Sequence, residues 1–188
     1  MLEDKCKYMK VRYTIPYSTN KNLAEAYNLE ISLGGAEYIA FTDRDIWFPH
    51  PNFAQQIERV IEQHGEAVYT CLTNRVNCPW QRIDFNGSDK EAEQFSRELY
   101  ANNVSAVEDH TDSQLMSGFV IIYPRRKWWG LPDGGLLGVD NMIHNMAKAA
   151  GLRVLLMKGI FVWHYYSGYT GPWEGAHRKR DKTHLPGS

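Results

Sequence analysis

The chain has 188 residues, of which 43% are hydrophobic and 23% are charged. This length and composition are typical of one globular domain and exclude a chain that is disordered throughout. The 21 Lys and Arg residues are balanced by 22 Asp and Glu residues, so no overall positive charge favours a nucleic-acid partner.

The hydrophobic pattern argues against a membrane protein. The longest uninterrupted apolar run covers residues 119–123, far fewer than the ~20 residues that a membrane-spanning helix needs. The charged start MLEDKCK lacks the apolar stretch of a signal peptide. We therefore expect no membrane span and a cytoplasmic location. Cys6, Cys71 and Cys78 form no CxxC pair, and buried free thiols are expected, although the last two could face each other across a loop.

A strand, a helix and a second strand are expected at the start of the domain. β-branched and aromatic residues at 10–17 predict a strand, and the polar segment after it predicts a helix over residues 22–33. Two glycines end this helix, and the apolar run 36–42 then predicts a buried strand that stops at acidic residues. This order favours a parallel crossover.

The remaining elements continue the alternation. Helical patterns cover residues 52–64, 89–102 and 139–153, and strand patterns cover residues 66–73, 115–124 and 154–166, the last being one strand or two short ones that finish at His164. Residues 74–90 predict a long surface loop, and residues 127–138, rich in Gly and Trp, are expected to line a pocket. The predicted fold class is α/β, a mostly parallel sheet flanked by helices, with one domain at 1–170 and a mobile basic tail at 171–188.

Two carboxylates follow the second predicted strand directly. Asp43 and Asp45 lie two residues apart in FTDRD, so both side chains can face the same way if the backbone stays extended. Oxygen ligands of this kind suit Mg²⁺ or Mn²⁺, which keep open positions for diphosphate oxygens. The alternative is that the pair only caps a turn or a helix.

His164 ends the last predicted strand in FVWHYY. A single histidine among bulky residues can be a core residue bonded to the backbone. It can also supply a third ligand from a distant strand end, because imidazole tolerates Mn²⁺. We expect Asp43, Asp45 and His164 to converge on one divalent cation, although Asp43 could instead hold a nucleotide ribose or Arg44.

Two further aspartates are candidates for a general base. Asp140 begins a predicted helix behind a Gly-rich loop, where it could simply interact with the helix dipole or could accept a proton from a hydroxyl nucleophile. Asp133, in LPDGG, is the competing candidate, and it is less well oriented because it lies in a flexible turn.

These segments together resemble a known enzyme family. IPYSTNKNLAEAYN, EYIAFTDRD, LMSGFVIIYPRRKWW, LLGVDNMIHNMAKAAGLRV and GIFVWHYY occur in this order over roughly residues 10–168, and the pattern resembles GT-A nucleotide-sugar glycosyltransferases, particularly glycosyltransferase family two. The resemblance implies a Rossmann-like GT-A fold. It also implies metal-dependent transfer of a sugar, with inversion, from a nucleotide-diphosphate donor to a carbohydrate or other hydroxyl acceptor.

The resemblance also implies roles for individual residues. Asp43, Asp45 and His164 correspond to metal ligands, and Asp140 corresponds to the catalytic base, with Asp133 as the alternative. The donor nucleotide and its sugar would be bound by a set of polar and small residues near the strand ends, namely Pro16, Tyr17, Ser18, Lys21, Asn22, Asn28, Asp43, Arg44, Ser117 and Gly118. Rings next to the site could face the acceptor, namely Trp47, Trp128, Trp129, Tyr165 and Tyr166, with Trp128 or Trp129 first among them.

The chain departs from the family in its first half. The family has a strand, a helix and another strand before the Asn-rich helix, whereas only one strand is predicted here before that helix. Either residues 15–18 serve as the family's first strand and its loop, or the predicted strand is a shortened form of one of the family's later strands. Two other functions remain open. One is a nucleotidyltransferase or sugar-nucleotide pyrophosphorylase, although the segment STNKN lacks the Gly-rich loop of those enzymes. The other is a non-catalytic carbohydrate-binding domain. The basic segment 177–182 is either a solvated tail or a lid that closes over the diphosphate.

Overall fold

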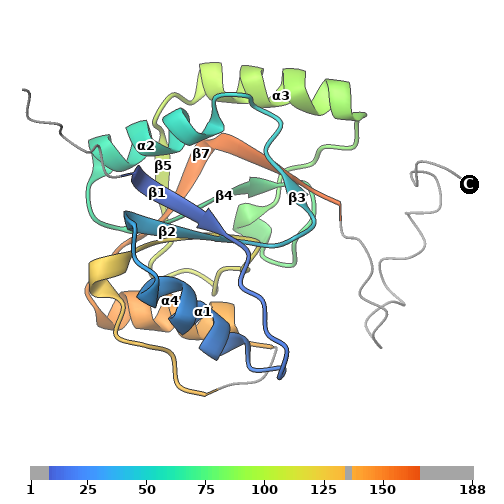
Figure 1. Ribbon diagram of the computed structural model, residues 1–188. Helices are drawn as coiled ribbons and strands as arrows, with labels where there is room; N and C mark the ends of the chain where they lie inside the picture. Colours follow the sequence, from blue (N-terminus) through green and yellow to red (C-terminus); the bar gives the residue numbers. More distant parts are fainter. Residues whose placement is uncertain (1–8, 134–136, 166–188) are drawn as a thin grey trace, which may run out of the picture.

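A computed structural model describes residues 9–133 and 137–165 of the chain (Figure 1). The predicted tail at 171–188, with its basic segment, lies outside the described residues, as do Cys6 and Tyr166. Within the described ranges, no helix combines the length and the apolar character needed to cross a membrane.

A seven-stranded mixed sheet forms the centre of the domain. Its strands are β1 (Met9–Thr14), β2 (Ala36–Thr42), β3 (Ile46–Trp47), β4 (Val68–Thr73), β5 (Val107–Asp109), β6 (Val120–Pro124) and β7 (Val154–His164). Neighbouring strands follow the order β1-β2-β6-β4-β7-β3, and β5 pairs with the first half of β7.

The prediction of a mostly parallel sheet is wrong. β1 and β2 are parallel, as are β4 and β7, but β6 runs antiparallel to both β2 and β4, and β3 and β5 run antiparallel to β7. A parallel connection needs a crossover, usually a helix. No helix separates β5 from β6, and the hydrophobic pattern of a buried strand carries no information about its direction.

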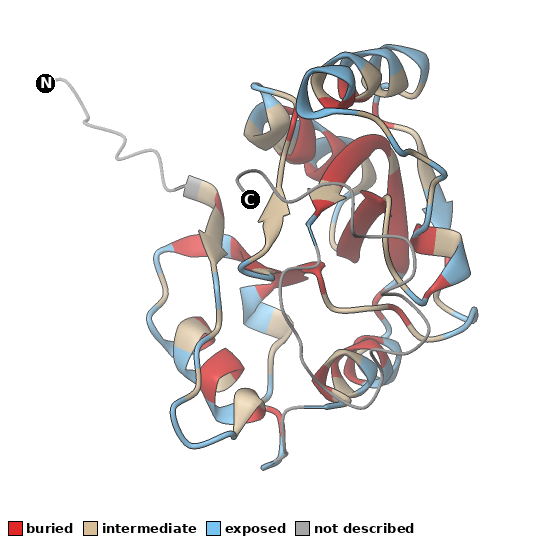
Figure 2. Ribbon diagram, turned by 90° about the vertical axis from the view of Figure 1, so that its right-hand side faces the viewer, coloured by how far each residue is buried: buried red, intermediate tan, exposed pale blue. Residues whose placement is uncertain are grey.

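Four helices cover the two faces of the sheet, α1 (Leu23–Ser32), α2 (Phe53–His64), α3 (Asp89–Asn102) and α4 (Val139–Ala149). The helices α1 and α4 lie on one face, and α2 and α3 lie on the other (Figure 1). Each face has its own apolar cluster, one containing Tyr27 and Ile143, the other Ile57 and Val60. Because helices cover both faces, β4 and β6 are buried along their whole length, and Figure 2 shows buried residues concentrated in the sheet.

Several elements match the sequence prediction closely. The bounds of β2 and α3 agree with it, and β7 is one strand that ends at His164. Cys71 and Cys78 are buried free thiols, as expected. β1 pairs directly with β2 and ends at Thr14, so residues 15–18 follow the strand rather than form it.

Other elements differ in extent. The predicted strand 115–124 is regular only from Val120, and the predicted loop 74–90 contains a short 3₁₀ helix, Pro79–Gln81. A second 3₁₀ helix, Arg125–Lys127, begins the segment expected to be irregular. The strands β3 and β5 were not predicted, because strands of two or three residues are too short to show an alternation of apolar and polar side chains.

Gly159 permits a close approach between β7 and the end of α3. The pairing register of β4 with β7 shifts between Cys71 and Leu72, and residues 158–160 form the irregular part of β7. A Cβ atom on Gly159 would lie 2.7 Å from the backbone oxygen of Asn103, which is too close for a stable contact.

We predict that Gly159→Ala lowers the free energy of unfolding by about 1–3 kcal/mol, the usual cost of overpacking. Lys158→Ala is the matched control, because this half-exposed side chain pairs with Glu108 at the surface, and the variant should change stability by less than about 0.5 kcal/mol. Urea unfolding measures both. Equal stability of the two variants would contradict the steric explanation.

Candidate metal centre

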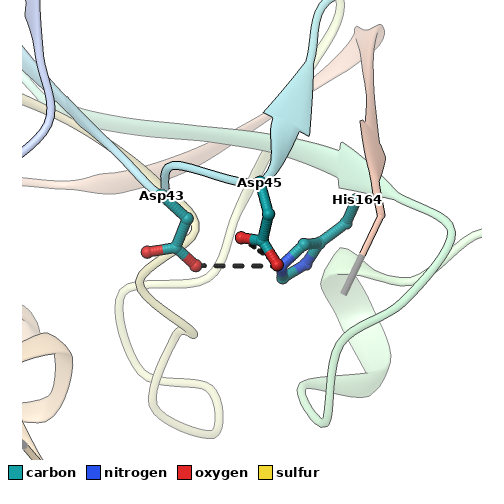
Figure 3. Close-up of side chains that lie close together, drawn as sticks. All are labelled: Asp43, Asp45 and His164. Carbon is teal, nitrogen blue, oxygen red and sulfur yellow. Dashed lines mark ion pairs between the residues drawn. The ribbon is translucent and has the colours of Figure 1, made fainter. Parts of the chain in front are cut away.

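Asp43, Asp45 and His164 converge at one end of the sheet (Figure 3). The Nε2 atom of His164 lies 3.4 Å from Oδ1 of Asp45 and 3.9 Å from Oδ2 of Asp43, and one ligand atom from each residue lies within 4.8 Å of the others. Ligands on one Mg²⁺ or Mn²⁺ ion, bonded at ~2.1 Å, lie about 3–4 Å apart. The three side chains therefore lie close enough together to share one cation, and binding of a cation stays a prediction.

Strand pairing brings the three residues together. Asp43 follows β2, and its backbone N–H donates a hydrogen bond to the carbonyl of Phe119, 3.0 Å away, just before β6. Ile46 of β3 pairs with His164 at the end of β7. The N–H of Tyr165 donates to the carbonyl of Asp45. Because β3 pairs with the end of β7, Asp45, which directly precedes β3, lies opposite His164.

The loop after β4 orients the ring of His164. Its Nδ1 atom lies 3.0 Å from the carbonyl oxygen of Arg75, and a carbonyl can only accept, so we assign the proton to Nδ1. The backbone N–H of His164 donates to Oδ1 of Asn74. With only 9% of its side chain exposed, the ring directs Nε2 toward the two carboxylates, as in many metal-ligating histidines.

The site is locally negative. About half of the Asp43 side chain is exposed (48%), yet the surrounding protein removes enough water to raise the pKa of this carboxyl group. The charges of Asp45 and Asp140 also raise the pKa of Asp43, and His164 acts in the opposite direction. A divalent cation between Asp43, Asp45 and His164 would favour the ionised form of both carboxyl groups.

Asp140 lies beside this cluster. It is in the first turn of α4, just after Gly138, whose left-handed φ of 85° starts the helix. Burial raises the pKa of Asp140, and hydrogen bonds from backbone N–H groups, including those of Asn141 and Gly118, oppose that effect. Because the Asp140 charge acts on Asp43, the two carboxylates belong to the same region.

Asp133 lies at the other end of the Gly-rich segment and is exposed. Its carboxylate accepts a hydrogen bond of 3.2 Å from the side-chain amide of Asn22, the N-cap of α1. The structure therefore gives Asp133 a contact with the start of α1, whereas Asp140 is the candidate base whose charge reaches Asp43.

Asn28 has a local structural role. Its Oδ1 atom accepts hydrogen bonds from the Trp128 indole and the Leu131 N–H, and its Nδ2 atom donates to the Leu131 carbonyl. These three bonds hold the segment after Arg125–Lys127 against α1. Trp128 also packs on Phe41 and Tyr123, so Trp129, which is 59% exposed, is the better candidate for a ring that contacts a ligand.

The other residues predicted to bind the nucleotide lie in or near the loop between β1 and α1. Tyr17 is exposed, the Ser18 hydroxyl donates to Asn20, and Lys21 has a left-handed φ of 62°. Pro16 belongs to the same loop, and Arg44 lies between the two aspartates of the cluster. Ser117 and Gly118 precede β6 and contact Gln81 and Asp140 respectively. Nucleotide binding by these residues stays a prediction.

Sequence reasoning missed two buried side chains near the cluster. Tyr27 is a buried residue of α1, and burial, followed by the charges of Asp43 and Asp140, raises the pKa of its hydroxyl. Gln81 is fully buried and bonds to Ser117. The helical spacing around Tyr27 indicated burial without function, and the aperiodic loop around Gln81 offered no signal.

No protein-family model matches this sequence, and a search of the curated proteins returns no significant match.

The electrostatics of Asp43 predict how stability depends on pH in the absence of metal. Because its folded-state pKa is raised, the folded protein holds this proton more tightly than the unfolded chain, and the stability so gained is lost as pH rises through the raised pKa. In EDTA at pH 7, Asp43→Asn should therefore raise Tm by roughly 1–2 °C, a small value because solvent screens the charge. The gain should shrink near pH 4.

The exposed Asp84→Asn variant is the control for this experiment, and its Tm should follow that of the unmodified chain at both pH values. A loss of Tm in Asp43→Asn at pH 7 would contradict the description of the cluster as an electrostatically unfavourable arrangement in metal-free protein.

Proposed function

We propose that this protein is a metal-dependent glycosyltransferase that moves a sugar from a nucleotide-diphosphate donor to a hydroxyl acceptor. The observation that carries the proposal is the convergence of Asp43, Asp45 and His164, with Asp140 close by. Strand ends that bring metal-ligand side chains next to a third carboxylate provide both electrostatic stabilisation and a proton acceptor. The GT-A resemblance of the sequence supplies the type of reaction.

The donor set fits Mn²⁺ or Mg²⁺. Two carboxylates are hard oxygen ligands suited to either ion, and a neutral imidazole is accepted more readily by Mn²⁺. Asp43, Asp45 and the Nε2 atom of His164 would hold the ion. When bound, it would neutralise the negative charge that develops on the departing nucleoside diphosphate.

The chain's own residues would then handle the acceptor. Asp140, with its carboxylate held by backbone N–H groups, would take the proton from the acceptor hydroxyl as that oxygen attacks the sugar. Gly118 lacks a side chain, and a Cβ atom there would come within 3.1 Å of the Asp140 Cβ, so the glycine permits this close arrangement. Single displacement with inversion follows from the family resemblance.

Nucleotide binding provides the first test. A thermal-shift screen of UDP, GDP, CDP and dTDP sugars, with and without Mn²⁺, should show a Tm increase for one base only when the metal is present. Asp45→Asn should abolish that increase, because it removes the less exposed of the two carboxylates that face His164. A non-catalytic carbohydrate-binding domain would instead keep its fold and show no metal-dependent nucleotide binding.

The second test concerns the general base. Asp140→Asn should lower kcat by roughly 10²–10⁴-fold while the donor affinity changes little, since base assistance typically contributes that factor. Asp133→Asn is the matched control and should retain most of the activity. Loss of transfer only in Asp133→Asn would reverse the two roles. Loss of metal-dependent donor binding in Asp140→Asn would show that Asp140 supports the cation instead.

A further inference from the structure

His144 joins the helix α4 to two points of the loop between β5 and β6. The N–H of Met116 donates a hydrogen bond to Nδ1 of His144, at 3.2 Å, and Nε2 of His144 lies 3.1 Å from the carbonyl oxygen of Thr111. The histidine is fully buried, with 0% of its surface exposed. One side chain of α4 therefore holds residues 111 and 116 of this loop at the same time.

These two partners define the protonation of the ring. A backbone N–H can only donate, so Nδ1 must be unprotonated, and a carbonyl can only accept, so we assign the proton to Nε2. The ring is therefore neutral, and burial, which disfavours a charged imidazole, lowers the pKa of His144 accordingly. A second proton, on Nδ1, would face the Met116 N–H and break that bond.

The same loop contacts Asp140 two residues after Met116. A Cβ atom on Gly118 would lie 3.1 Å from Cβ of Asp140, so the backbone of this glycine packs directly against the aspartate. Asp140 precedes His144 by about 6 Å along the helix axis, and two residues of chain span at most about 7 Å. The segment 116–118 therefore fits along one turn of α4, with the bond to His144 at one end and the contact with Asp140 at the other.

We propose that His144 is a positioning residue, which holds the segment 116–118 against α4 and thereby keeps Asp140 in place. Through Gly118, the segment limits where the Asp140 side chain can lie, because the close packing leaves no room on that side. The importance of this for sugar transfer rests on the proposed function, but the contact between Gly118 and Asp140 does not.

Gln81 holds the middle of the same segment from another direction. Its Oε1 atom accepts from the N–H of Ser117, at 2.7 Å, and its Nε2 atom donates to the carbonyl of Ser117, at 3.2 Å. Loss of the bond between Met116 and His144 should therefore shift the segment rather than unfold it.

Two variants of His144 separate its two bonds. In His144→Asn, the side-chain oxygen can replace Nδ1 as the acceptor for the Met116 N–H. In His144→Gln, the side-chain nitrogen can replace Nε2 as the donor to the Thr111 carbonyl. Both variants lose the ring, so each is the matched control for the other.

NMR on the full chain without metal provides the readout. In His144→Gln, hydrogen exchange of the Met116 amide should accelerate by roughly five- to tenfold, and the nuclear Overhauser effect between the Gly118 Hα and Asp140 Hβ protons should be lost. In His144→Asn, both should stay close to those of the unmodified chain. Equal losses in the two variants would overturn the proposal, since they would reflect lost packing of the ring. An unchanged Overhauser effect in His144→Gln would also overturn it.

The unmodified chain provides a second test if His144→Gln fails to fold. Lowering the pH protonates Nδ1, so the Overhauser effect between Gly118 and Asp140 should fade with the midpoint of the His144 ring and not with that of the Asp140 carboxyl group. The charged groups that face the ring, Lys148 of α4 and Asp112 of the loop, pair with each other at 2.8 Å. An effect that persists after the ring is protonated, or that follows Asp140, overturns the proposal.

Activity supplies an independent readout. Because a displaced Asp140 accepts the proton less well, kcat should fall by roughly tenfold or more in His144→Gln, with the Mn²⁺ affinity and the donor KM unchanged. His144→Asn should restore most of the lost kcat, and equal kcat values in the two variants would contradict the proposal. If the unmodified chain neither binds Mn²⁺ nor transfers sugar, the proposed function fails, and the NMR comparison still tests His144.

Discussion

The structure holds two carboxylates within a few ångströms of one histidine nitrogen, and the arrangement of this end of the sheet depends on that constraint. Asp43 and Asp45 repel each other, and Asp140 adds a third negative charge nearby. Pairing of β3 with the end of β7 and the bond from His164 to the Arg75 carbonyl keep the groups in place. A divalent cation held between these side chains would offset the repulsion by adding positive charge.

The fold was predictable where a pattern of adequate length exists. β2 has seven residues and α3 has fourteen, which is long enough to show an apolar run and a helical pattern respectively. The bounds of both elements agree with the sequence prediction. Strand direction was not predictable, because β6 is buried on both faces and reads the same in either orientation. The turn that places Asp45 opposite His164 depends on β3, whose two residues show no period at all.

The candidate site was predictable to the extent that it lies at strand ends. Asp43, Asp45 and His164 each follow or end an apolar run, and this position alone indicated that they could meet. The residues that hold His164 in place could not be predicted, because they lie in a loop without a periodic pattern. Asn74 binds the backbone of His164 through its side-chain oxygen, and Arg75 binds the ring through its backbone carbonyl. Asn28 resembled a ligand-binding residue in the sequence, yet its amide is engaged with Trp128 and Leu131.

The most direct measurement is the position of a manganese ion in crystals of the full chain grown with Mn²⁺, located by anomalous diffraction. One strong peak is expected within about 2.0–2.3 Å of carboxylate oxygens from Asp43 and Asp45 and of the Nε2 atom of His164. A well-ordered cluster with no anomalous peak at saturating Mn²⁺, or a peak bound only by residues elsewhere, would contradict the proposed metal site.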